Sequence, residues 1–292
     1  MAAAGWKVRA HRAAWRLGLD VLPVGPESRE IDSLEGEDVV RLQGLVQRAL
    51  GYSRDVASYE PPEWLPLVSD ALRLAAEGHV PRAQILQDVW VLRQTAFAAS
   101  GYFVEIGAAD GYYLSNTWLL EHDYGWSGLL CEPSPVLART ARGRGRPRAV
   151  VDDRAVWSAT GDRVELLLAD ERTTVVELGA SDAHAAARRR AARGQDRVSV
   201  ATVSPQDLLV EHGSPSWIDY LSVDTEGSEP LILRSFPWSD YGVGLLTVEH
   251  NHVPGRVDEL DSILLPRGFR RELTSWSGYD AWYVHSDLSA PA

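Results

Sequence analysis

Two carboxylates and two glycines stand close together in the segment 104–111, which reads VEIGAADG. A short apolar run precedes the glycines and a helical pattern follows them, which predicts a strand, a glycine turn and a helix. In an open parallel sheet, ligands bind at the carboxyl ends of strands, beside such turns. Glu132 ends the next apolar run, 21 residues after Gly111, which is the spacing at which an acid binds ribose hydroxyls. The pattern therefore predicts a cofactor that contains a ribose.

Two classes of cofactor share this arrangement, and the carboxylates distinguish them. A dinucleotide site uses a third glycine to bring backbone amides to the pyrophosphate, and this turn has only Gly107 and Gly111. Glu105 and Asp110 would each repel a pyrophosphate by about 1 kcal/mol or more. The same charges suit the ammonium and sulfonium groups of S-adenosylmethionine (SAM). The residues favour SAM over NAD, and a purely structural role of the two acids in the turn is the alternative.

A second group of acids and imidazoles follows two later apolar runs. These runs read LSVDTEG and LLTVEHNH, and they supply Asp224, Glu226, Glu249, His250, Asn251 and His252. If these runs are strands of a doubly wound sheet, their carboxyl ends line the same crevice. One hypothesis makes His250 or His252 a general base, with Asp224 beside it as a catalytic group. The other lets Asp224 and Glu249 bind Mg²⁺, with His250 or Asn251 as the third ligand, so that the metal lowers the pKa of an attacking hydroxyl.

These side chains need a scaffold, and the pattern of apolar residues predicts one from residue 101 onward. Short apolar runs alternate with helical stretches, which indicates a doubly wound, mostly parallel α/β sheet with helices on both faces. We expect strands or extended segments over 103–108, 128–132, 148–157, 161–169, 197–203, 218–224 and 243–250, helices over 115–125, 135–145 and 228–236, and a hairpin over 268–285. Residues 1–100 are expected to form a helical extension that serves as a cap, an oligomer contact or a substrate lid, and 101–292 the second domain.

Two segments of the sequence resemble those of a known family. FVEIGAADGYYLSNTWLLEHDYGWSGLLCEPSP and IDYLSVDTEGSEPLIL look like the FkbM family of SAM-dependent methyltransferases, and the likeness spans about residues 87–283. The resemblance implies a Rossmann-like class I methyltransferase fold, with Glu132 at the ribose and Asp153, or equally Asp152, at the adenine side. It also implies which residues surround the methionine part of SAM: Glu105, Gly107, Asp110, Gly111, Ser115 and Asn116.

The later strand ends are also similar to those of macrocin-type sugar O-methyltransferases, from which this chain departs by having His250 after Glu249. We therefore predict a SAM-dependent O-methyltransferase that acts on a hydroxyl of a sugar or natural product, with assistance by Mg²⁺ left open. The alternatives are an NAD-dependent oxidoreductase and a non-catalytic SAM-binding module. We expect a small-molecule or glycan acceptor, and a homo-oligomer is left open.

Charge and composition exclude other partners. The chain has 29 basic and 41 acidic residues and a net charge of −12, which argues against nucleic acids and anionic membranes as partners. Two arginine-rich stretches, 139–148 and 188–197, lack interleaved aromatic residues, so we interpret them as solvated loops or helix faces. The longest apolar runs are too short to cross a membrane. A single cysteine, Cys131, and an N-terminus unlike a signal peptide predict a cytoplasmic protein.

The aromatic residues allow two interpretations. The chain has eleven tryptophans, and Trp64, Trp276, Tyr279 and Trp282 could stack on a sugar or polyketide acceptor. More often such residues pack in the core. The structure decides between these interpretations.

Overall fold

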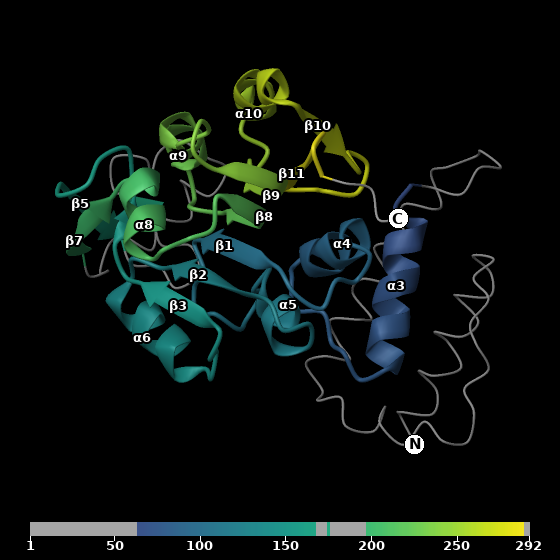
Figure 1. Ribbon diagram of the computed structural model, residues 1–292. Coiled ribbons are helices and arrows are strands. Elements are labelled where there is room, and N and C mark those ends of the chain that lie inside the picture. Colours follow the sequence, from purple (N-terminus) through teal and green to yellow (C-terminus); the bar gives the residue numbers. More distant parts are fainter. Residues whose placement is uncertain (1–62, 168–173, 176–196, 289–292) are drawn as a thin grey trace. The chain divides into compact units, whose positions relative to one another are not determined.

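The computed structural model describes residues 63–167, 174–175 and 197–288 (Figure 1). The chain divides into two compact units, one that ends at Pro81 and one that begins at Arg82. In the first unit, helix α3 (Leu65–Ala76) is the described element and has a proline in its first turn. The second unit begins before the change of pattern at residue 101 and includes helix α4 (Gln87–Gln94). Among the described residues, no helix has the length and apolar character needed to span a membrane.

A seven-stranded sheet forms the centre of the second unit, in the order β10-β11-β9-β8-β1-β2-β3. Its strands are β1 (Tyr102–Ile106), β2 (Ser127–Cys131), β3 (Ala149–Asp152), β8 (Trp217–Val223), β9 (Gly242–Glu249), β10 (Phe269–Glu272) and β11 (Asp280–His285). Neighbouring strands are parallel from β3 to β9, whereas β11 is antiparallel to both β9 and β10. The doubly wound, mostly parallel sheet and the terminal hairpin are confirmed.

Helices cover both faces of this sheet, α8, α9 and α10 on one face and α4, α5 and α6 on the other (Figure 1). Their bounds are α5 (Trp118–His122), α6 (Pro135–Gly143), α8 (Pro205–Glu211), α9 (Glu229–Ser235) and α10 (Arg256–Leu264), and a 3₁₀ turn, η2 (Leu265–Arg267), follows α10. The face toward α8, α9 and α10 is apolar. Val104 and Ile106 of β1 pack there with Leu208, Ile232 and Leu260 in one buried cluster. This cluster stabilises the fold by removing apolar surface from water.

Side chains of the alternate residues form a buried polar row on the other face. The strand register places Glu105 of β1 beside Ser222 of β8, and Ser222 beside Thr247 of β9. All three are almost completely buried. The Tyr220 hydroxyl lies 2.7 Å from Thr247 Oγ1, as expected because buried polar groups need hydrogen-bond partners. The row crosses the three strands close to their carboxyl ends, at Ile106, Val223 and Glu249.

A smaller sheet in the order β4-β7-β5-β6 lies beside the main one. Its strands are β4 (Ala155–Val156), β5 (Arg163–Leu167), β6 (Thr174–Val175) and β7 (Arg197–Val203). The single strand predicted over 148–157 is therefore wrong. Asp152 Oδ1 accepts a hydrogen bond of 2.9 Å from the Arg154 amide, and the chain turns there, so that β3 stays in the main sheet while β4 pairs with β7. The extended segments predicted over 161–169 and 197–203 are confirmed as the antiparallel strands β5 and β7 within 161–167 and 197–203, and residues 168–169 lie outside the described residues.

Helix α5 is shorter than the predicted 115–125, because it begins only at Trp118. Ser115 Oγ accepts hydrogen bonds from the amides of Thr117 and Trp118, at 3.2 and 3.1 Å. Side-chain bonds of this kind compete with a regular helix. The polar residues before α5 consequently form a loop.

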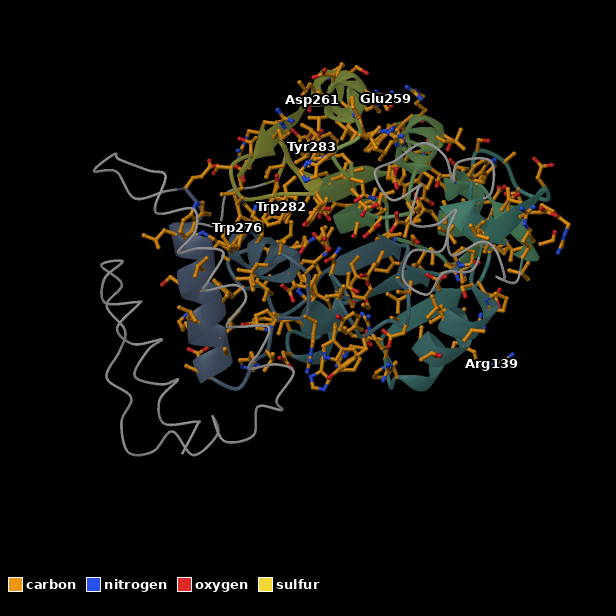
Figure 2. All side chains as sticks on the ribbon, turned by 180° about the vertical axis from the view of Figure 1, so that it is seen from behind. Arg139, Glu259, Asp261, Trp276, Trp282 and Tyr283 are labelled. Carbon is orange, nitrogen blue, oxygen red and sulfur yellow. The ribbon has the colours of Figure 1, made fainter. Side chains whose placement is uncertain are left out.

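The tryptophans of the hairpin region pack in the interior (Figure 2). Trp276 and Trp282 are fully buried, and the ring of Trp282 lies 5.1 Å from that of Trp90 in α4. Core packing is confirmed for both, and stacking on an acceptor is wrong for both. Trp64, in the first unit, is also buried, whereas Tyr279 is 38% exposed.

We expect Trp282→Ala to lower the free energy of unfolding by about 3–5 kcal/mol, because the large buried ring leaves a cavity. Urea denaturation of the purified protein measures this change. The control is Tyr279→Ala, for which we expect a loss of about 1 kcal/mol or less because the ring is partly exposed. Equal losses in the two variants would contradict the packing described here.

Candidate active site

A cavity of about 1050 Å³, its open mouth included, lies at the carboxyl ends of β1, β2 and β8. Ligands bind in this position in open parallel sheets, and cofactor pockets have volumes of about 300–1,000 Å³. Its main walls come from residues 105–109, 113–116, 131–133, 154–157 and 224–226. The glycine turn, the end of the next strand and the end of β8 thus meet around one space, as the sequence predicts.

The turn after β1 lies against the end of β8. Gly107 has a φ of +91°, and a Cβ atom on it would stand 1.6 Å from the carbonyl oxygen of Asp224. The amides of Gly107 and Ala108 donate to the carbonyl oxygen of Cys131, at 2.9 and 3.1 Å. Only glycine fits such a close approach with this backbone conformation. Gly107 therefore positions the walls of the cavity through its backbone.

Glu105, at the end of β1, binds the loop that precedes α5. Its Oε1 accepts the Asn116 amide at 2.7 Å, and its Oε2 accepts the hydroxyls of Ser115 and Thr117 at 3.0 and 2.5 Å. Burial raises the pKa of Glu105, and Arg146 and these hydrogen bonds oppose that shift. Glu105, Ser115 and Asn116 all line the cavity, but the Glu105 carboxylate is already committed to the loop.

Asp110 organises the turn itself. Its Oδ1 accepts the amides of Tyr112 and Tyr113 at 2.9 and 2.7 Å, and its Oδ2 forms an ion pair with Arg144. Neither Asp110 nor Gly111 is among the residues that line the cavity. The sequence predicted both near the methionine part of SAM, and the structure instead gives the Asp110 side chain a structural role in the turn.

Asn116 carries an acceptor without a partner. The residue is 8% exposed and lines the cavity, and its Nδ2 donates to Ser222 Oγ at 2.9 Å. Its Oδ1 is buried and has no hydrogen-bond partner among the described residues. A buried acceptor left unpaired costs about 1–3 kcal/mol. The arrangement indicates that a ligand supplies an N–H or O–H donor here.

Glu132 directly follows β2 and is buried. Among the described residues, no cation contributes to the shift of its pKa. Its two carboxylate oxygens accept the amides of Ser134 and Ala109, at 2.8 and 2.9 Å. Burial raises the pKa of Glu132 to about 7, and the two amide bonds only partly offset that rise. Hydroxyl groups that donate to this carboxylate would favour its ionised form.

The two acids at the end of β3 do not line the cavity. Asp152 is buried and binds the Arg154 guanidinium and His212 Nε2, the latter at 2.9 Å. Asp153 points to solvent and pairs with Arg142 at 2.9 Å. Neither acid lines the cavity, whereas Arg154 does. The adenine-side role predicted for Asp153 is therefore not supported by its position, because the turn after β3 directs its side chain outward.

Asp224 and Glu249, at the ends of β8 and β9, form a carboxyl pair. Their side chains hydrogen-bond to each other. Burial raises the pKa of both groups, and the nearby charges of Glu226 and Glu229 raise both further. Two adjacent carboxyl groups with raised pKa values cannot both be ionised cheaply, which favours a state in which the pair holds one proton. Asp224 lines the cavity, and its partner Glu249 is not among the lining residues.

The two histidines occupy different surroundings. His250 Nε2 donates to the carbonyl oxygen of Asp280 at 3.1 Å, and its Nδ1 accepts the amide of His252 at 3.1 Å. Both ring nitrogens of His250 are therefore engaged, and burial lowers its pKa. His252 is exposed, with its ring 5.2 Å from that of Tyr279. Neither histidine is among the residues that line the cavity.

Two of the predicted metal ligands, Asp224 and Glu249, lie together, but the third, His250, does not join them. No three acidic, imidazole or thiol side chains of the described residues are arranged to hold a metal ion. Asp224 and Glu249 bind each other, His250 binds backbone groups, and the Asn251 amide donates to Glu226 at 3.3 Å. The described residues therefore do not bring Asp224, Glu249 and His250 together as one ligand set, and a metal at this place stays a prediction.

Strained backbone gathers around the cavity and the adjoining loop. Left-handed φ angles occur at five non-glycine residues here: Ala109, Leu114, Glu226, Asn251 and His252. Such conformations cost about 1–3 kcal/mol each and persist where the surroundings enforce them, often at functional sites. No motif in the sequence signals them, because these residue types are common in ordinary loops.

The arginine-rich stretch 139–148 is only partly solvated. Arg139 is exposed on α6 (Figure 2), as predicted. Arg146 is buried and donates through Nε to the buried Glu121, so the solvated interpretation is wrong for it. The second stretch, 188–197, lies outside the described residues except for its last residue. Nothing in the composition distinguishes Arg146 from its exposed neighbours.

The strand order, with one antiparallel strand inserted near the edge, is that of the Rossmann-like class I methyltransferase fold. The sequence matches the methyltransferase FkbM domain over residues 105–271, which is more than half of the chain. The chain belongs to this family, and the predicted resemblance is confirmed. No curated protein matches the chain.

Three solved structures illustrate the likeness. Methyltransferase FkbM from Methylobacillus flagellatus KT is 14% identical, over 85% of this chain and 59% of that one, with a TM-score of 0.42. The fibrillarin pre-rRNA processing protein of Methanococcus jannaschii is 11% identical, over 64% and 66%, with a TM-score of 0.35. A TehB-like SAM-dependent methyltransferase from Corynebacterium glutamicum ATCC 13032 Kitasato is 13% identical, over 74% and 94%, with a TM-score of 0.33. The chain thus spans less than two thirds of the first two structures.

Glu132 makes stability depend on pH. Its pKa is about 7 in the folded protein against an ordinary 4.5, so the folded state binds more protons than the unfolded state between these values. The contribution of this group to the free energy of unfolding of the protein therefore falls as pH rises from about 4.5 to 7, by at most about 1.4 kcal/mol per pH unit. We expect Glu132→Gln to flatten this fall relative to the wild type, as measured by urea denaturation at pH 5, 6, 7 and 8. Parallel pH profiles for the two proteins would contradict the raised pKa.

Proposed function

We propose that this protein is a SAM-dependent methyltransferase that methylates a hydroxyl group of a sugar or natural-product acceptor. The observation that carries the proposal is the charge of the cavity wall. Glu105, Glu132, Asp224 and Glu226 line it, and the one lining cation among the described residues, Arg154, is already bound by acidic partners. Such a wall disfavours a pyrophosphate and suits a cationic ligand. Membership of the FkbM methyltransferase family supports the same conclusion.

The residues present fit SAM. Glu132 would bind the ribose hydroxyls, since its carboxylate is buried and no cation among the described residues pairs with it. The unpartnered Oδ1 of Asn116 would accept from the ammonium group. Val156, Trp157 and Leu166 form the apolar part of the wall on the side of Arg154 and would contact the adenine. When bound, SAM supplies a methyl group on a sulfonium, which is already reactive toward an oxygen nucleophile.

The protein then needs to align the acceptor and to take up a proton. Alignment in a closed site can supply much of the rate enhancement. We propose that the Asp224–Glu249 pair is the general base. With one proton shared, the pair still carries one negative charge. It would accept the proton that the acceptor hydroxyl loses as its oxygen bonds to the methyl carbon and the sulfur–methyl bond breaks, which leaves a neutral thioether. Asp224 of this pair lines the cavity, whereas Glu249 and the predicted bases His250 and His252 are not among its lining residues.

Calorimetric titration with S-adenosylhomocysteine (SAH), the demethylated product, tests the cofactor class. We expect SAH to bind and NAD, the control, not to bind. Because ribose hydroxyls favour the ionised form of Glu132, SAH affinity is expected to fall as pH drops below about 7. Glu132→Gln should weaken SAH binding and remove most of this pH dependence. Binding of NAD, or of neither compound, would overturn the assignment.

Asp224→Asn tests the proposed base. We expect a loss of about 10²–10⁴-fold in kcat, the usual contribution of a general base. Labelled SAM and a panel of hydroxyl acceptors serve as substrates, and SAH affinity should stay within a few-fold of wild type. His252→Ala is the control and should retain activity, because its ring is exposed and outside the cavity.

The same turnover assay, repeated with the chelator EDTA, tests whether a metal takes part. We expect EDTA to leave turnover unchanged, because the predicted ligands are not arranged to hold a metal. Loss of turnover with EDTA and its recovery with Mg²⁺ would contradict the carboxyl pair as the sole activating group. Absence of turnover over a wide panel, together with SAH binding, would instead favour a non-catalytic SAM-binding module.

A further inference from the structure

A buried guanidinium stands behind the loop that precedes α5. Arg146 follows α6, and its side chain is 2% exposed. Its Nε donates to Glu121 Oε2, its Nη1 to the carbonyl oxygen of Gly111 at 2.9 Å, and its Nη2 to Thr117 Oγ1 at 2.8 Å. Its Nη1 also donates to Ser115 Oγ at 3.2 Å. One side chain therefore binds both ends of the loop 111–117.

The charge of Arg146 is matched to two buried acids. Its Nη1 lies 4.0 Å from Glu105 Oε2, and its Nε binds Glu121, and both carboxylates are nearly inaccessible to water. The rings of Phe103 and Trp118 lie within 5.5 and 5.6 Å of the guanidinium carbon and complete its enclosure. A planar guanidinium can bind several acceptors in fixed directions, which an ammonium cannot reproduce. Removal of this cation would leave buried carboxylates without a partner.

The contacts of Arg146 reach the cavity through Thr117. The Thr117 hydroxyl accepts from Arg146 and donates to Glu105, while Glu105 accepts the backbone amide of Asn116. Asn116 lines the cavity, and its Oδ1 has no partner among the described residues. Its orientation thus depends on a series of hydrogen bonds that begins at Arg146.

We propose that Arg146 is a positioning residue for cofactor binding: it fixes the loop 111–117 so that Asn116 presents its acceptor to the cofactor. This inference rests on the proposed function, because the loop holds a cofactor only if the cavity binds SAM. Arg146 itself does not line the cavity. Its effect on the cofactor is therefore transmitted by Ser115, Thr117 and Glu105.

Calorimetric titration with SAH of the wild type, Arg146→Lys and Arg148→Lys tests the proposal. Arg148 is a matched control, since it is exposed and its guanidinium makes one long contact, 3.4 Å, to the Gly125 carbonyl oxygen. We expect Arg146→Lys to weaken SAH affinity roughly tenfold or more, as is typical when a group that orients a ligand-binding residue is removed. Arg148→Lys should bind as the wild type does.

The titration is made well below the melting temperature of each variant, with near-ultraviolet circular dichroism as the check on folding. A residue that only stabilises the fold would lower the melting temperature and leave the SAH affinity of the folded protein unchanged, and that result would overturn the proposal. If Arg146→Lys yields no folded protein, SAH titration of Thr117→Val tests the proposal instead. This substitution removes the hydroxyl that connects Arg146 to Glu105 and keeps the shape of the side chain. Weaker SAH binding by Thr117→Val supports the proposal, and wild-type affinity overturns it. Failure of the wild type to bind SAH would instead overturn the proposed function.

Discussion

The contact between the turn after β1 and the end of β8 determines the rest of the site. The Asp224 amide donates to the carbonyl oxygen of Ile106 at 2.9 Å, and Gly107 follows with no room for a side chain against the Asp224 carbonyl. Two strand ends that are more than a hundred residues apart in the sequence are thereby held in backbone contact. The loop that carries Asn116 and the loop that carries Glu226 consequently face one cavity. A larger residue at position 107 would separate them.

The cost of buried charge shapes what each acid of the site can do. Glu105 is compensated by Arg146 and three hydrogen bonds, and it serves the loop. Asp224 and Glu249 reduce their joint charge by sharing a proton. Burial raises the pKa of Glu132 to about 7, because its two amide donors offset the rise only in part and no cation of the described residues lowers it further. The least compensated acid is the one whose charge a ligand donor would relieve most, which is why Glu132 is the strongest candidate for cofactor contact.

The sequence predicted the elements that depend on local patterns. Buried parallel strands read as continuous apolar runs, so the positions of β1, β2, β8 and β9 were predictable, and the motifs placed Glu132, Asn116 and Asp224 at one cavity. The break between β3 and β4 was not predictable, because it depends on the side chain of Asp152 and on pairing with a distant strand. Arg146 was missed for a similar reason. Its partner Glu121 lies 25 residues away, and only the fold brings the two together.

The choice of the base depends on which group has a free lone pair at the cavity. A histidine accepts a proton through a ring nitrogen that makes no other bond, and His250 uses one nitrogen to donate and the other to accept. To act as a base it would first have to release the His252 amide. The Asp224–Glu249 pair has oxygens beyond those in its mutual hydrogen bond, and Asp224 lies on the cavity wall. Uptake of a proton by this pair also removes a buried negative charge, so desolvation favours the transfer. The same burial that makes the pair costly to ionise therefore makes it an effective proton acceptor.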